Sequence, residues 1–160
     1  TTPARCVKAL VALVSALREK GHSFIAVWGH SLGTGIAVQA ASMTSEIGAL
    51  ILTAPFAKTL GVTPWRIYGS VSPSFVDPFP TATTLFKIST PINVFHGDED
   101  RTIPYSEGEI VYDSSRASVK GYIRLKGVKH NDMFSSCFLF EKVNDFLKMV
   151  RETNDEGSRS

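Results

Sequence analysis

The residues with the clearest potential for chemistry are a serine set between two glycines, in the motif Gly29-His30-Ser31-Leu32-Gly33. A serine raised on a tight turn from a strand into a helix can serve as a nucleophile. Such a turn predicts strained dihedral angles at Ser31 and no room for a Cβ atom at Gly29 or Gly33. Backbone N–H groups at the start of the helix would then face an oxyanion formed there. Taken alone, the motif also fits an ordinary glycine-rich turn.

A nucleophilic serine needs a base, and the base needs an acid that fixes its tautomer. His130 lies in the loop 127–132 after the last expected strand, from which it could reach over the sheet. The stretch 96–104 follows the preceding strand and supplies three carboxylates, of which Asp100 is one. Ser31, Asp100 and His130 stand in the chain order expected for this kind of elbow. Each follows the carboxyl end of a strand, where open parallel sheets place their sites.

The three remaining histidines suit the role of base less well. His22 precedes a strand, on the far side of the sheet from the elbow. His30 lies within the elbow, and its neighbours are expected to point its ring away from the serine. His96 ends a strand and is expected to be a packed, hydrogen-bonded side chain there. The sequence therefore favours His130.

The elements that must position these residues follow from the pattern of apolar residues. Helices are expected where apolar residues recur every three or four positions, and strands where short apolar runs end at Gly or Pro. Their alternation predicts an α/β fold with a mostly parallel sheet flanked by helices. The expected helices are 4–20, 34–43, 105–117 and 138–150, and the expected strands are 23–28, 48–53, 91–96 and 122–125.

Composition limits the class of protein. The 160 residues are 43% apolar and 20% charged with a net charge of +2, which fits one globular domain and excludes a disordered, collagen-like or coiled-coil chain. There is no dense basic cluster, so no nucleic-acid partner is expected. The sequence shows no membrane-spanning stretch and no signal peptide. Two cysteines, Cys6 and Cys137, are expected to be buried thiols in a reducing, cytoplasmic compartment.

Three blocks of the sequence resemble the catalytic blocks of the α/β-hydrolase superfamily. They are GHSLGTG (29–35), HGDEDRTIP (96–104) and GVKHND (127–132). Three stretches are similar to serine hydrolases that act as protein depalmitoylases: DPFP (77–80), KISTPINVFHG (87–97) and KHND (129–132). The elbow is equally similar to monoacylglycerol and lysophospholipid lipases. The resemblance runs over nearly the whole chain.

The resemblance implies a role for each matching residue. Ser31 would be the nucleophile, His130 the general base and Asp100 the acid, and Leu32 would donate its backbone N–H to the oxyanion hole. No metal and no cofactor would be needed. The other carboxylates of the acid loop would be Asp98 and Glu99, with Asp98 the next candidate for the acid.

The chain departs from the family in its number of strands. The family's sheet usually has eight strands, and residues 1–152 would supply the last four, followed by a flexible tail at 153–160. The chain is therefore expected to be the C-terminal part of the fold, without the loop that gives a second oxyanion donor. The strand at 23–28 would be an exposed apolar edge through which chains could associate into oligomers.

The aromatic stretch 56–87 leaves two interpretations open. It could form a cap that presents an apolar surface to an acyl chain, or its aromatic residues could belong to the core. The triad handles thiol and alcohol leaving groups alike, so the sequence does not choose between thioesters and oxyesters. The aromatic residues are Phe56, Trp65, Tyr68, Phe75, Phe79 and Phe86.

The leading hypothesis is a serine hydrolase that cleaves acyl esters or thioesters through an acyl-enzyme on Ser31. An inactive hydrolase-like binding module and a serine peptidase of the same fold are the alternatives. Acylated proteins or lipids would be the substrates, and the enzyme would then work at a membrane surface, with any anchor upstream of Thr1.

Overall fold

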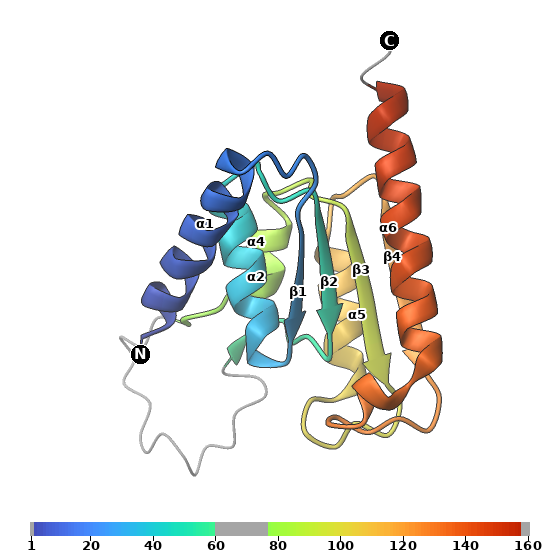
Figure 1. Cartoon of the computed structure of the whole chain (residues 1–160). Coiled ribbons are helices and arrows are strands. Elements are labelled where there is room, and N and C mark those ends of the chain that lie inside the picture. The colour runs from blue at the N-terminus through green and yellow to red at the C-terminus, as the bar shows by residue number, and fades with distance from the viewer. Residues whose placement is uncertain (1, 60–76, 158–160) are drawn as a thin grey trace.

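The fold is built on a parallel β-sheet. A computed structural model describes residues 2–59 and 77–157, and Figure 1 shows its strands side by side. Each neighbouring pair of strands is parallel, and their order in the sheet is their order in the sequence. This confirms the expected α/β class. The strands are β1 (Ala26–His30), β2 (Ala49–Thr53), β3 (Ile92–Gly97) and β4 (Lys120–Leu125).

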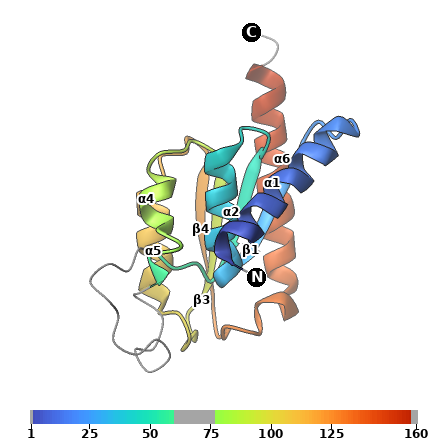
Figure 2. The same ribbon diagram turned by 90° about the vertical axis from the view of Figure 1, so that its left-hand side faces the viewer.

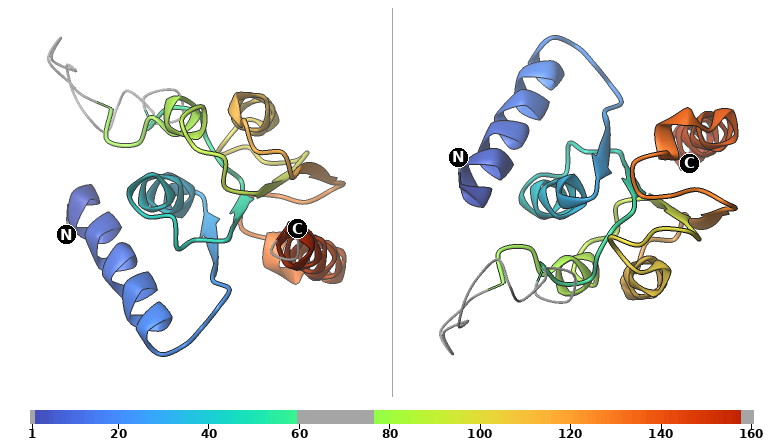
Figure 3. Two further views of the ribbon diagram at one scale, coloured as in Figure 1. Left: turned by 90° about the horizontal axis from the view of Figure 1, so that it is seen from above. Right: turned by 90° about the horizontal axis from the view of Figure 1, so that it is seen from below.

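Helices cover both faces of the sheet, as Figures 2 and 3 show. On one face lie α2 (Leu32–Met43), α4 (Thr81–Leu85) and α5 (Tyr105–Ser114). The N-terminal helix α1 (Pro3–Glu19) packs against α2, and the long helix α6 (Cys137–Gly157) covers the opposite face. This layered arrangement leaves the carboxyl ends of the strands open, at the bottom of Figure 1.

The hydrophobic core is divided by the sheet into two clusters. Successive side chains of a strand point to opposite faces, so Leu50 and Leu52 of β2 belong to one cluster and Ile51 to the other. Val7 and Val14 of α1, which lie on one face of that helix, join the first cluster. Both central strands, β2 and β3, are buried along their whole length.

Several observed boundaries differ from the expected ones: α5, for example, ends at Ser114 rather than at 117, and β4 begins at Lys120 rather than at 122. The first strand begins at Ala26, where pairing with Ala49 begins, and continues to His30. The short helix α4 was not predicted, because five residues give no periodic pattern. The last helix continues past Val150 to Gly157, so the first part of the expected tail is helical; no Gly or Pro interrupts it before that residue.

The aromatic stretch at 56–87 contributes to the core at both of its ends. Phe56 and Phe79 are buried in the cluster that also contains α2, so the core interpretation holds for these two residues. Phe86 is exposed, and the guanidinium carbon of Arg116 lies 3.6 Å from the centre of its ring. The remaining aromatic residues of the expected cap, Trp65, Tyr68 and Phe75, lie outside the described residues.

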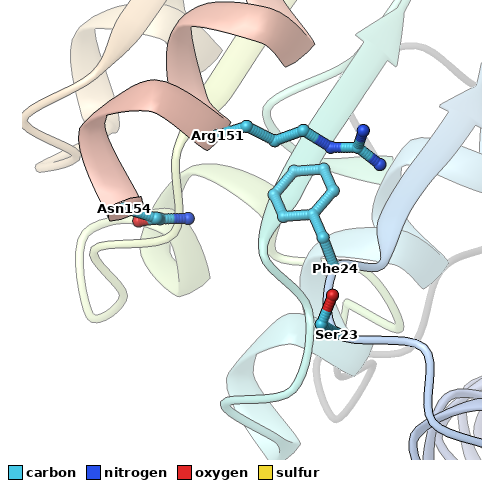
Figure 4. A pocket seen from close by; sticks show the side chains of 4 residues that line it. All are labelled: Ser23, Phe24, Arg151 and Asn154. Atoms are coloured by element: carbon cyan, nitrogen blue, oxygen red, sulfur yellow. The ribbon is translucent and has the colours of Figure 1, made fainter. Parts of the chain in front are cut away.

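The amino end of the sheet carries a cavity of about 310 Å³. Ser23 and Phe24, just before β1, form one side of it, and Arg151 and Asn154 of α6 form the other (Figure 4). The Arg151 guanidinium carbon lies 5.0 Å from the centre of the Phe24 ring. None of these residues belongs to the predicted triad, whose members follow the carboxyl ends of the strands.

Both cysteines are free thiols. Cys6 is partly buried, but Cys137, the first residue of α6, is exposed, so the expectation that both are buried is wrong for Cys137. Across residues 2–59 and 77–157, no helix combines the length and the apolar character that crossing a membrane requires. The same residues contain no group of three or more side chains suited to hold a metal ion.

Candidate active site

Ser31 occupies a strained turn between β1 and α2. Its φ of 51° lies in the left-handed region that residues other than glycine rarely adopt. Its N–H donates to the carbonyl of Thr53 at 2.9 Å, and its own carbonyl accepts from Thr34 N. The neighbouring strand and the first turn of the helix therefore hold the strain at this serine, as expected for a nucleophile elbow.

The two elbow glycines differ in what surrounds them. A Cβ at Gly29 would lie 2.6 Å from the carbonyl oxygen of Gly33, so this position does require glycine. A Cβ at Gly33 would meet no described atom within 4 Å, and the expected clash there is wrong. The close approach is instead made at Gly35, where a Cβ would lie 2.7 Å from the side chain of Phe79.

His130 reaches the serine from the opposite edge of the sheet. Three strand spacings separate β1 from β4, about 14 Å, so the loop after β4 must run back across the carboxyl ends of the strands. Gly127 turns this loop with a φ of 70°, and the carboxylate of Asp98 accepts from its N–H at 2.7 Å. The ring of His130 arrives with Nε2 at 3.1 Å from the Ser31 hydroxyl.

Asp100 completes the arrangement. Its side chain is fully buried, and its Oδ2 lies 2.7 Å from Nδ1 of His130. Oδ1 accepts from the backbone N–H groups of Thr102 and Ile103 at 2.8 and 2.9 Å. The carboxylate is therefore fixed by its own loop and presents one oxygen to the imidazole. A carboxylate in this position holds His130 with its proton on Nδ1 and leaves Nε2 free to accept a proton from Ser31.

The other carboxylates of this loop lie outside the triad. Asp98 pairs with Arg124 at 2.8 Å and accepts from Gly127 N, and these hydrogen bonds lower the pKa of its carboxyl, the bond from Gly127 first. It joins the acid loop to the loop of the base. Glu99 lines a polar hollow of about 240 Å³ beside His130. The hollow is lined by Glu99, Arg101, Thr102, Lys129, His130, Asn131 and Asp132.

Leu32 is the first residue of α2 and follows the serine directly. Within residues 2–59 and 77–157, its backbone N–H has no hydrogen-bond acceptor, as is usual for the first residue of a helix. Its position at the helix N-terminus suits a donor to an oxyanion beside Ser31. Its side chain is 54% exposed.

Two further histidines lie close to the triad. The ring of His30 lies 5.1 Å from the ring of His130, centre to centre, and its Nδ1 bonds to Thr53 rather than to the serine. His96 is fully buried; its Nε2 bonds to the Ile103 carbonyl at 3.0 Å and lies 3.5 Å from Asp100 Oδ2. The fourth histidine, His22, belongs to the loop before β1, at the amino end of the sheet.

Burial lowers the pKa of both neighbouring histidines. For His30, the nearby His130 lowers the pKa further, and nearby Asp100 opposes this. For His96, the hydrogen bond to Ile103 and the charge of Asp100 oppose the effect of burial. Nδ1 of His96 has no partner within the described residues, so a protonated ring would leave a buried N–H without an acceptor. Both rings are therefore neutral neighbours of the acid–base pair at pH 7.

The proximity of His30 to His130 was missed in the sequence. The GHSLG motif itself contains the signal, because His30 is the residue just before the serine. The position of the His30 ring could be recognised only from the register of β1 against β2, which places His30 opposite Thr53.

Comparison of the sequence with known proteins identifies relatives of this chain, and comparison of the structure identifies proteins with a similar fold. No protein-family model matches the chain. Human Protein ABHD12B is 30% identical over 154 residues, covering 81% of this chain and 42% of that protein. Human alpha/beta hydrolase domain-containing protein 17C is 29% identical over 124 residues, covering 77% of this chain and 36% of that protein. The chain spans less than half the length of the curated relatives it matches.

The fold is shared with solved enzymes of low sequence identity. The monoacylglycerol lipase of Paleococcus ferrophilus matches with a TM-score of 0.67 at 13% identity, covering 94% of this chain and 75% of that one. A likeness at this identity concerns the fold alone. The parallel sheet, the elbow and the structural likeness lead to one conclusion: the chain has the α/β-hydrolase fold, and its sequence is similar to that of an alpha/beta hydrolase domain-containing protein.

Proposed function

We propose that this chain carries the catalytic triad of a serine hydrolase that cleaves acyl esters or thioesters. The observation that supports this most directly is the continuous contact from Ser31 Oγ to His130 Nε2 at 3.1 Å and from His130 Nδ1 to Asp100 Oδ2 at 2.7 Å. Nucleophile, base and orienting acid within hydrogen-bond reach are the geometric signature of nucleophilic acyl transfer.

In the first half of the proposed reaction, Ser31 Oγ attacks the acyl carbonyl carbon while His130 Nε2 takes the hydroxyl proton. The electron pair of the carbonyl double bond moves to the oxygen, where the N–H of Leu32 donates to it. Collapse of this intermediate breaks the bond to the leaving thiol or alcohol, which receives the proton from His130. The product is an acyl-enzyme on Ser31.

The second half repeats these steps with water. His130 takes a proton from water as its oxygen attacks the acyl carbonyl, and the proton returns to Ser31 Oγ as the acid leaves. Asp100 stabilises the imidazolium that forms in each half and stays ionised throughout. No step requires a metal or a cofactor.

An acyl chain is the substrate group that the surroundings of the serine support best. Leu32, directly after Ser31, and Phe134 expose 54% and 45% of their surfaces. Phe134 reaches the site through His30, whose ring it meets edge-on at 5.1 Å. A contiguous exposed apolar patch commonly marks a binding surface for an apolar group, and we propose that these two side chains belong to one.

The experiment is covalent labelling of the chain by a fluorophosphonate probe, with Ser31→Ala and heat-denatured protein as controls. Labelling that is lost in both controls is the expected result, followed by turnover of matched oxyesters, thioesters and peptides that share one acyl group. Folded protein that takes up no probe would contradict the proposal and favour a binding module that keeps the hydrolase fold.

A further inference from the structure

Thr53, the last residue of β2, forms more hydrogen bonds to the elbow than any predicted triad member does. Its backbone carbonyl accepts from Ser31 N at 2.9 Å. Its hydroxyl donates to the carbonyl of Gly29 at 3.1 Å and lies 3.2 Å from both Trp28 Nε1 and His30 Nδ1. Thr53 is completely buried. The side chain of Thr53 thus contacts three consecutive residues of β1, from Trp28 to His30, and its backbone carbonyl holds the serine that follows them.

These bonds fix the proton on His30. A hydroxyl has one hydrogen and two lone pairs. The hydrogen of Thr53 is given to Gly29, and one lone pair accepts the indole N–H of Trp28, which can only donate. The second lone pair must then accept from His30, so Nδ1 of His30 carries the proton. A neutral ring in this form leaves its Nε2 without a hydrogen.

His30 in turn confines the proposed base. Its ring lies between two others, with His130 at 5.1 Å and 40° and Phe134 at 5.1 Å and 71°. The hydrogen bond to Thr53 prevents the His30 ring from turning within this stack. Since the ring is neutral, it adds no repulsion when His130 becomes an imidazolium during the reaction.

We propose that Thr53 is a positioning residue for this site, which fixes the tautomer and ring plane of His30 and thereby the place of His130 beside Ser31. The inference rests on the proposed function, because a positioning role requires a reaction at Ser31. Thr53 touches no reacting atom itself. Ala54, directly after it, has a φ of 48° and donates its N–H to Phe95, which fixes the end of β2 from the other side.

The test compares Thr53→Val, which keeps the branched shape and loses the hydroxyl, with Thr53→Ser, which keeps the hydroxyl. Two quantities are measured on the whole chain: the rate of fluorophosphonate labelling and the ¹⁵N shifts of the His30 ring, which report its tautomer. We expect Thr53→Val to slow labelling about tenfold, the equivalent of the lost hydrogen bond to His30, which is the one of the three that acts on the base, and to mix the tautomers of His30. Thr53→Ser is expected to restore both.

The outcomes separate this inference from the proposed function. A wild-type His30 with its proton on Nε2 overturns the inference, even if Thr53→Val fails to fold. Equal labelling rates in wild type and Thr53→Val overturn it as well, while the proposed function stands. If the folded wild type carries the proton on Nδ1 of His30 but takes up no probe, the absence of labelling refutes the proposed function. The positioning role then fails as well, because no reaction occurs at Ser31.

Discussion

Gly97, at the end of β3, leaves no room for a side chain beside Val128 of the base loop, and Gly97→Ala is expected to push the acid loop and the base loop apart. A Cβ at Gly97 would lie 2.1 Å from the carbonyl oxygen of Val128 and 2.9 Å from its carbonyl carbon. Both atoms are backbone, so no side chain can turn aside. Ordinary contact requires at least 3.4 Å, and the loops must therefore move apart by about 1 Å.

This displacement acts directly on the proposed triad. Asp100 follows Gly97 by three residues, and His130 follows Val128 by two, so the 2.7 Å bond between their side chains spans the widened gap. The Val128 carbonyl also accepts from Glu99 N at 3.2 Å, and the movement breaks this bond too. A misplacement of about 1 Å costs on the order of 10²-fold in rate. Overpacking costs about 1–3 kcal/mol of stability.

The assay is the rate of fluorophosphonate labelling beside the thermal unfolding of the same sample. Gly121→Ala is the matched control, because a Cβ there meets the end of the Asn93 side chain at 2.6 Å, which can turn away, and it lies in β4 at the opposite end from the triad. We expect near wild-type labelling from the control. Gly97→Ala that is labelled at the wild-type rate, or a control that is slowed equally, would refute the reasoning.

Two further predictions concern the carboxylates and the buried histidine. Asp100→Asn is expected to reduce the rate of labelling about 10⁴-fold by disturbing the tautomer of His130. Asp98→Asn loses only contacts between the loops and should keep most of the rate. If Asp98→Asn were instead the slower variant, Asp98 would be the acid and Asp100 the loop contact. The second is a dependence of stability on pH. Burial lowers the pKa of His96 in the folded chain below its ordinary value of 6.5. Between these two pKa values the unfolded chain binds a proton that the folded chain does not, so the free energy of unfolding falls as the pH drops below 6.5, by up to about 1.4 kcal/mol per pH unit for this group. The free energy of unfolding, measured with urea at several pH values from 8 to 5, should depend less steeply on pH in His96→Gln than in the wild type. An equally steep dependence on pH in both would mean that His96 does not titrate in this way.

The arrangement at the carboxyl edge of the sheet could be predicted because its signals are local. Each of Ser31, Asp100 and His130 lies in the turn or loop that follows an apolar run, and parallel strands bring such turns to one edge. The catalytic roles of these residues remain a prediction. The sequence contained the same local signals for the sheet, whose class is confirmed, but not for its boundaries, which depend on where each neighbouring strand begins.

The features that could not be predicted depend on contacts between distant segments. The sequence predicts Thr53 only as the end of a buried strand. Its hydrogen bonds to the elbow depend on the strand register, which pairs Thr53 with His30. Gly33 was expected to be crowded because of its place in the motif, yet the crowding falls on Gly35, where Phe79 packs. The helix α4 has too few residues to show periodicity, and the burial of Leu85 stabilises it instead.

The sequential order of the strands has a consequence for how the site assembles. Asp100 and His130 are 30 residues apart and follow neighbouring strands, so β3 and β4 suffice to bring them together. Ser31 and His130 are 99 residues apart and follow the two outermost strands. Their contact exists only when every strand between them is in place, and contacts of such long range form late in folding. Reactivity at the serine would therefore show that the entire sheet is formed. The contact between Asp100 and His130 would show only that β3 and β4 are paired.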